Sequence, residues 1–159
     1  MPVYIGIDWS QAKHDVCVLN EAGGAVAQFV MPHTAEGLQM LERQRQALGV
    51  SPAECVVGIE TAYTLVIDFL WSHAYEQVYV TPPSVIGGAR ARFRSSGART
   101  DPSDAYMIAD TLRTDRGRLQ AWHPDGALTQ ELRRRVGLVR HLTRSITVRI
   151  PAKTISHSG

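Results

Sequence analysis

The chain alternates short apolar runs with segments in which apolar residues recur at helical spacing. Five of the runs have the composition and length of β-strands; they cover residues 3–8, 14–20, 25–32, 54–60 and 77–80. The first three are joined by short connections, one of them the turn Ala22-Gly23-Gly24, which is typical of an antiparallel meander. We therefore predict a sheet of five strands.

Helical segments separate and follow these strands, so the element order is that of an α/β protein. Thr34 is placed to cap a helix that runs to about Ala47, and Thr61 is placed to cap an apolar one. A loop with Gly and Ser divides two further helices, and Pro151 ends the last and longest helix. These three helices are predicted at about 84–92, 102–113 and 128–150.

The composition fits one globular domain with an appended helix, since the 159 residues are 44% hydrophobic and 20% charged. No apolar run approaches the roughly 20 residues of a membrane span. The N-terminus also lacks the basic-then-apolar layout of a signal peptide. We therefore expect a cytoplasmic protein with no membrane contact, in which Cys17 and Cys55 are reduced core residues.

Charge is distributed unevenly along the chain, although the net charge is only +2. Residues 1–88 carry three basic and nine acidic side chains, whereas residues 89–159 carry fourteen basic and six acidic ones. An excess of positive charge in one half favours a polyanionic partner such as nucleic acid.

Two groups of arginines are candidates for contacts with nucleic-acid phosphates. They are Arg90, Arg92, Arg94 and Arg99, before the acidic stretch 99–105, and Arg133, Arg140 and Arg144 in the predicted helix 128–150. The same helix repeats Leu132, Val139 and Ile146 every seven residues, a seam through which two copies of the chain are expected to associate. A solvated charged face and ordinary helix packing are the alternative interpretations.

The stretch RTDPSDA at 99–105 itself has two interpretations. Asp101 is a good N-cap, Pro102 suits the first position of a helix, and Asp104 faces the positive end of the helix dipole. Alternatively, positions i and i+3 at a helix start are neighbours, so both carboxylates are available to one ligand. The two roles are compatible at Asp101.

Two further acids end predicted strands: Asp8 ends the first and Glu60 the fourth. If these strands are adjacent and parallel, both acids emerge at the carboxyl edge of the sheet, where open α/β sheets carry their sites. Asp101 and Asp104 would complete a cluster of oxygen ligands that suits Mg²⁺ or Mn²⁺. Without a cation, we expect the carboxylates to separate or to pair with Lys13 or an arginine.

Four stretches of the chain carry a family resemblance: GIDWSQAKHDV (6–16), GIETAYT (58–64), VTPPSV (80–85) and RTDPSDA (99–105). In order and spacing they resemble the N-terminal domain of the DEDD transposases of the insertion-sequence-110 family, which are related to the Piv DNA invertases. That domain is similar to the RuvC Holliday-junction resolvase and has the ribonuclease H-like fold. The resemblance implies such a domain over residues 1–124, with a catalytic, metal-binding tetrad of Asp8, Glu60, Asp101 and Asp104.

The resemblance also implies partners and a further domain. Members of the family continue through a helical coiled-coil region into a C-terminal domain with a nucleophilic serine, and they recombine DNA with a structured guide RNA. We therefore expect residues 125–159 to begin the coiled-coil region and the serine domain to be absent. Because Ser10, Ser95 and Ser96 match no family motif, the chain as given is expected to nick DNA slowly at most and not to exchange strands.

Three other functions compete with this one. ATPases of the actin and sugar-kinase type also begin with a GID strand, but Trp9-Ser10-Gln11-Ala12 lacks the glycine-rich phosphate loop that they need. A structure-specific nuclease of the RuvC type and a non-catalytic nucleic-acid-binding fragment remain as alternatives. Divalent-metal binding by the tetrad distinguishes the transposase and the RuvC-type nuclease, which need it, from the non-catalytic fragment.

Overall fold

The computed structural model describes residues 1–61, 65–95, 103–124, 126, 135 and 139. The chain divides into two units, Met1–Trp122 and His123–Gly159, and the strands and helices below belong to the first. In the second unit, Arg135 and Val139 are helical. The rest of the predicted helix at 128–150, including Arg133, Arg140, Arg144 and most of the apolar seam, lies outside the described residues.

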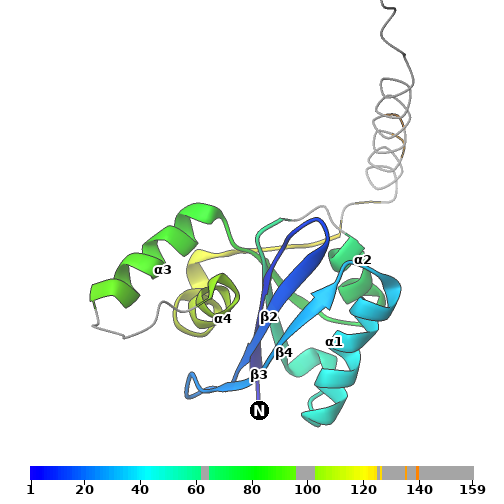
Figure 1. Ribbon diagram of the computed structural model, residues 1–159, viewed down its shortest axis with the longest axis horizontal. Helices are drawn as coiled ribbons and strands as arrows, with labels where there is room; N and C mark the ends of the chain where they lie inside the picture. Colours follow the sequence, from blue (N-terminus) through cyan, green and yellow to red (C-terminus); the bar gives the residue numbers. More distant parts are fainter. Residues whose placement is uncertain (62–64, 96–102, 125, 127–134, 136–138, 140–159) are drawn as a thin grey trace, which may run out of the picture. The chain divides into compact units, whose positions relative to one another are not determined.

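Within the described residues, a mixed sheet of six strands forms the centre of the first unit (Figure 1). The strands are β1 (Val3–Asp8), β2 (Lys13–Leu19), β3 (Ala25–Pro32), β4 (Cys55–Ile59), β5 (Gln77–Val80) and β6 (Gln120–Ala121). Their order across the sheet is β3-β2-β1-β4-β5-β6. The first three strands form the predicted antiparallel meander, β4 runs parallel to β1, and β5 runs parallel to β4. The predicted number of five strands was one too low, because β6 is too short to show an apolar pattern.

The described helices are α1 (Ala35–Ala47), α2 (Leu65–Ser72), α3 (Pro83–Ser95) and α4 (Asp104–Asp115). Thr34 caps α1 as predicted, since its hydroxyl accepts the Gly37 N–H at 3.1 Å. The predicted start of α4 was wrong. The helix begins at Asp104 and is capped by Ser103, whose hydroxyl accepts the Tyr106 N–H at 3.2 Å, because serine caps a helix as well as aspartate does. The predicted cap of α2 at Thr61 stays a prediction, because residues 62–64 lie outside the described part.

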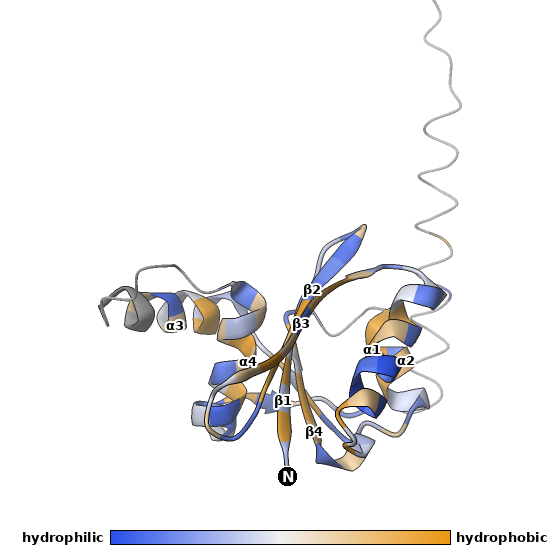
Figure 2. Ribbon diagram, turned by 60° about the horizontal axis from the view of Figure 1, so that its bottom comes forward, coloured by the Kyte–Doolittle hydropathy of each residue, from blue (hydrophilic) through white to orange (hydrophobic). Residues whose placement is uncertain are grey.

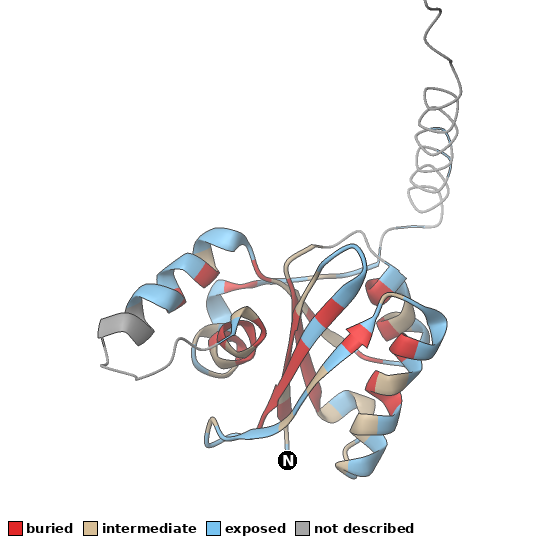
Figure 3. Cartoon of the chain, viewed as in Figure 1, coloured by how far each residue is buried: buried red, intermediate tan, exposed pale blue. Residues whose placement is uncertain are grey.

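Helices cover both faces of the sheet (Figures 1 and 2). On one face, α1 and α2 pack against alternate residues of the central strands in a large apolar core that includes Ile5, Ile7, Val57 and Ile59. On the other face, α4 lies against β1, β2 and β4, and α3 packs beside α4. Figure 3 shows that the buried residues concentrate in the strands and on the helix sides that face them. Burial of this apolar surface supplies the main driving force for the fold.

Two paired glycines allow α4 to lie very close to the sheet. Gly6 of β1 and Gly58 of β4 are in register. A Cβ atom on Gly6 would lie 2.0 Å from the carbonyl oxygen of Ala105 in α4. A Cβ atom on Gly58 would lie 2.7 Å from the Cγ2 atom of Ile108. The glycines therefore determine how near the start of α4 comes to the ends of β1 and β4.

The α1/α2 face contains an ion pair between Glu42, which is buried, and Arg45, which is partly buried. Glu42 of α1 accepts hydrogen bonds from the Arg45 guanidinium, with Nη2 and Oε2 2.7 Å apart, and from the Tyr75 hydroxyl at 2.5 Å. Arg45 also donates to the carbonyl oxygen of Val50 at 2.6 Å. The network ties α1 to the segment that precedes β5, with each charge matched by an opposite charge or a hydrogen bond.

Cys17 and Cys55 are buried and free, as the sequence predicted. No helix in the described part of the chain is long and apolar enough to cross a membrane.

Candidate metal and nucleic-acid site

A row of acidic side chains lies at the carboxyl edge of the central strands. Asp8 is the last residue of β1, Glu60 directly follows β4, and Ile7 is in register with Ile59, which confirms that these strands are adjacent and parallel. Asp8 is also in register with Asp15 of β2. Since side chains alternate along a strand, the three carboxylates lie on the same face as the two paired glycines, the face that α4 covers.

Helix α4 adds a third predicted ligand to the row, and α3 adds an arginine. The close approach of Ala105 to β1 brings the preceding residue, Asp104, to the edge where Asp8 and Glu60 lie. The Nη2 atom of Arg90 forms an ion pair with Oδ1 of Asp104, with the two side chains 44% and 31% exposed. Pairing of one carboxylate with an arginine is the behaviour expected of a cluster of like charges.

Charges within the row shift the pKa values of Asp8 and Glu60. Burial raises the pKa of Asp8 above its usual range, and the charges of Asp104 and Asp15 raise it further, while Arg90 lowers it. Burial likewise raises the pKa of Glu60, followed by the charges of Asp8 and Asp104, again with Arg90 acting in the opposite direction. Arg90 therefore lowers the pKa values of Asp8 and Glu60 by less than burial and the neighbouring carboxylates raise them.

The donor set of the row fits a hard divalent cation in chemical type. It consists of carboxylate oxygens, which Mg²⁺ and Mn²⁺ prefer, and a cation would offset its negative charge. The fourth predicted ligand, Asp101, lies outside the described residues. Among the residues that are described, no three His, Cys, Asp or Glu side chains are arranged to hold one ion.

A groove of about 480 Å³ opens beside the acidic row, between the sheet and the start of α4. Its lining includes Asp15, Gln28, Val30, Ser103 and Ala105. A second groove, of about 420 Å³, lies between α3 and the end of α4 and includes none of the predicted site residues. Asp15 is the member of the acidic row that lines the first groove, and neither lining includes Asp8, Glu60 or Asp104.

Of the seven arginines predicted to contact nucleic acid, Arg90 is the one whose side chain the structure describes, and it lies at the acidic row. The side chains of Arg92, Arg94, Arg99, Arg133, Arg140 and Arg144 lie outside the described residues. Their role therefore stays a prediction.

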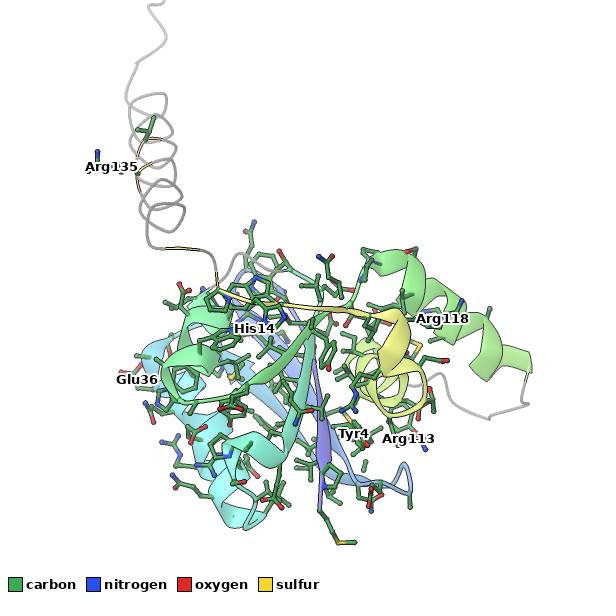
Figure 4. All side chains as sticks on the ribbon, turned by 180° about the vertical axis from the view of Figure 1, so that it is seen from behind. Tyr4, His14, Glu36, Arg113, Arg118 and Arg135 are labelled. Atoms are coloured by element: carbon green, nitrogen blue, oxygen red, sulfur yellow. The ribbon has the colours of Figure 1, made fainter. Side chains whose placement is uncertain are left out.

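A histidine pair lies on the opposite face of the same sheet edge. His14 is fully buried, its Nε2 atom is 2.8 Å from Nδ1 of His33, and its ring stacks on Trp9 with centroids 6.3 Å apart. Figure 4 shows His14 on the side of α1 and α2, whereas Tyr4 and Arg113 lie on the side of α4. Burial lowers the pKa of His14, as does the charge of His33, against the opposing effect of Asp15. His14 stacks on Trp9, the residue after Asp8, and so supports the loop between β1 and β2.

Asp15 is a member of the row that the sequence pattern did not predict. The segment HDVCVLN was identified as a strand, but its register with β1 was not predicted. The short connection between the two strands could have revealed the pairing, since it places Asp15 opposite Asp8 in an antiparallel hairpin.

Comparison with solved structures defines the class of the fold. RuvC from Thermus thermophilus, solved in complex with a Holliday junction substrate, matches 77% of this chain and 100% of its own chain, with a TM-score of 0.53 and 15% sequence identity. The sheet order and the flanking helices are accordingly those of the RuvC-like branch of the ribonuclease H-like fold.

The family model of the DEDD transposases of IS110, described as "Transposase", matches residues 5–153, so the chain belongs to this family. A candidate transposase of the mini-circle IS117 from Streptomyces coelicolor is 29% identical over 133 residues, which are 83% of this chain and 32% of that protein. The candidate transposase y4uE of Sinorhizobium fredii is 31% identical over 114 residues, which are 70% of this chain and 32% of that protein. The chain thus spans about a third of the length of these curated relatives.

Proposed function

We propose that this domain is the metal-dependent DNA-cleaving part of a transposase, with Asp8, Glu60, Asp101 and Asp104 as ligands of Mg²⁺ or Mn²⁺. The observation that carries the proposal is the register of β1 and β4, which places Asp8 and Glu60 side by side while the two glycines bring Asp104 to them. Three carboxylates from distant parts of the sequence share one edge of the sheet, where their mutual repulsion costs stability unless a cation offsets it.

The ions, when bound, would polarise the scissile phosphate and activate the attacking oxygen. The pairing of β1 with β4 holds the backbone of Asp8 beside that of Glu60. Asp104 lies on a helix terminus and is paired with Arg90. If Asp104 bound a cation in place of Arg90, the Arg90 guanidinium would be available to a DNA phosphate, which it could bind through two N–H groups.

Transposition by the longer relatives needs more than this domain. Recombination through a covalent intermediate requires a nucleophilic side chain that stays attached to the DNA end. We propose that this nucleophile and the choice of target, through a guide RNA, depend on parts of the protein beyond the acidic row. Incubation of the 159-residue chain with donor DNA, target DNA, guide RNA and Mg²⁺ should yield slow nicking and no recombinant junctions. A protein–DNA adduct that survives denaturation would show that the nucleophile lies within the chain.

Calorimetric titration with Mn²⁺ and Mg²⁺ tests the proposed metal site. The wild-type chain should bind either cation, and Asp8→Asn should lose at least about tenfold in affinity while keeping its circular-dichroism spectrum. Asp110→Asn is a matched control, because Asp110 is an α4 carboxylate paired with Arg113 away from the row. Equal binding by all three proteins would exclude the tetrad as the metal site. No binding by the wild type would favour a non-catalytic nucleic-acid-binding domain.

A further inference from the structure

A buried threonine at the end of β5 extends the acidic row. Ile59 of β4 is in register with Val80 of β5, and the Thr81 N–H donates to the carbonyl oxygen of Ile59 at 2.9 Å. The pairing of the two strands therefore continues one residue beyond Val80 and places Thr81 beside Glu60. Tyr79, two residues earlier, packs with Val56 in the cluster on the α4 face. By alternation, the Thr81 side chain is on the face that carries the carboxylates.

The Thr81 hydroxyl makes no hydrogen bond within the described residues, although the side chain is completely buried. Such groups are rare because removing a hydroxyl from water without replacing its hydrogen bonds costs free energy. The backbone that follows Thr81 does not supply the missing hydrogen bond. A threonine hydroxyl in a turn commonly accepts the N–H two residues later, but residues 82 and 83 are both prolines and have no N–H.

We propose that Thr81 is a positioning residue of the acidic row, whose hydroxyl donates a hydrogen bond to the Glu60 carboxylate. A hydroxyl is a donor as well as an acceptor, and Glu60 is the charged acceptor next to it by register. Rotation about the side-chain bonds of Glu60 would be needed to form this hydrogen bond, since the Thr81 hydroxyl has no partner among the residues that the structure describes. The bond would fix one Glu60 oxygen and leave the other free for a cation, so the inference rests on the proposed metal site.

Three variants of the full chain separate this role from a structural one. Thr81→Val removes the hydroxyl and keeps the shape, Thr81→Ser keeps the hydroxyl, and Thr81→Ala is a second hydroxyl-free variant if Val is not accommodated. Thr111→Val is the matched control, because Thr111 is equally buried but its hydroxyl already donates to the Met107 carbonyl oxygen at 2.8 Å. The readouts are Mn²⁺ affinity by calorimetry and the pKa of Glu60 in metal-free protein by carboxyl ¹³C NMR.

Thr81→Val should weaken Mn²⁺ binding by about five- to tenfold, as expected for the loss of one hydrogen bond to a charged group, and should raise the pKa of Glu60. Thr81→Ser and Thr111→Val should stay within about twofold of the wild type in Mn²⁺ affinity. A Thr81→Val protein with wild-type affinity and wild-type Glu60 pKa overturns the inference. If the wild type takes up no Mn²⁺ but Thr81→Val still raises the Glu60 pKa and Thr81→Ser does not, the positioning role stands and the proposed metal site falls. If the wild type binds Mn²⁺ and no variant changes either quantity, the positioning role falls and the proposed metal site stands.

Discussion

Acidic side chains on the two faces of the sheet have pKa values shifted in opposite directions. On the α1/α2 face, burial raises the pKa of Glu42, but hydrogen bonds from Arg45 and Tyr75 outweigh this effect and hold the pKa below its usual range. On the α4 face, burial and neighbouring carboxylates raise the pKa values of Asp8 and Glu60, and Arg90 opposes them without cancelling the effect. A closed network of this kind stabilises a fold, whereas a cluster of like charges is typical of a site that binds a cation.

The largest effect should come from breaking the close contact between α4 and the sheet. Gly6→Ala places a methyl group against the Ala105 backbone, which cannot rotate away as a side chain can. We expect a loss of about 4 kcal/mol or more in the free energy of unfolding, measured by urea denaturation. Gly87→Ala is the control, because a Cβ atom there meets nothing within 4 Å in a helix, and alanine should raise stability by about 0.5–1 kcal/mol. A Gly6→Ala protein as stable as the wild type would contradict the packing described for α4.

The next effect tests the closed network on the α1/α2 face. Arg45→Leu leaves the Glu42 carboxylate buried with the Tyr75 hydroxyl as its remaining described partner. Removing one member of a buried ion pair should cost about 3 kcal/mol in the free energy of unfolding. The Arg113–Asp110 pair on α4 has side chains that are 28% and 15% exposed, so Arg113→Leu should cost less than about 1 kcal/mol. Equal losses would mean that the Glu42 pair is no more important than an ordinary helix-surface pair.

The two faces should also respond to pH in opposite directions. A lowered Glu42 pKa means that this group contributes stability above its ordinary pKa, and the contribution is lost as pH falls through the folded-state value. Raised pKa values mean that Asp8 and Glu60 lower stability progressively as pH rises from about 4 through their folded-state values. Asp8→Asn should therefore raise the melting temperature of metal-free protein at pH 7 by about 2–4 °C. Melting curves between pH 4 and 8 check this, and a lower melting temperature for Asp8→Asn at neutral pH would reverse the assignment.

The smallest effect concerns Arg90. If this side chain contacts one DNA phosphate, Arg90→Ala should lower the magnitude of the slope of log affinity against log salt by about 0.9. Arg118→Ala, in the groove between α3 and α4, should leave the slope unchanged. The measurement is fluorescence anisotropy of labelled duplex DNA at several salt concentrations. An identical slope for both variants would remove Arg90 from the DNA contact.

Much of the fold followed from local patterns. The apolar runs located five strands, and Thr34 marked the start of α1, because such features depend on residues close together in the sequence. The strand β6 and the cap of α4 at Ser103 were missed, since a two-residue strand has no periodicity and serine competes with Asp101 for the same role.

Only part of the site could be predicted from the sequence. Asp8 and Glu60 were placed at strand ends by pattern alone, and the adjacency of their strands is confirmed by the register. Thr81 and the Arg90–Asp104 pair depend on which residues face each other across the sheet and between helices. Such relations between distant segments are tertiary and leave no trace in local periodicity.

The central claim is that carboxylates from β1, β4 and the start of α4 form one divalent-metal site. The most direct test is a crystal structure of the chain with Mn²⁺, using anomalous scattering to locate the ions. We expect one or two manganese peaks within about 2–2.5 Å of carboxylate oxygens of Asp8, Glu60 and Asp104, with Asp101 completing the set and Arg90 moved away from Asp104. Manganese bound elsewhere would contradict this claim. So would ordered side chains of Asp8, Glu60 and Asp104 with no ion between them at a saturating Mn²⁺ concentration.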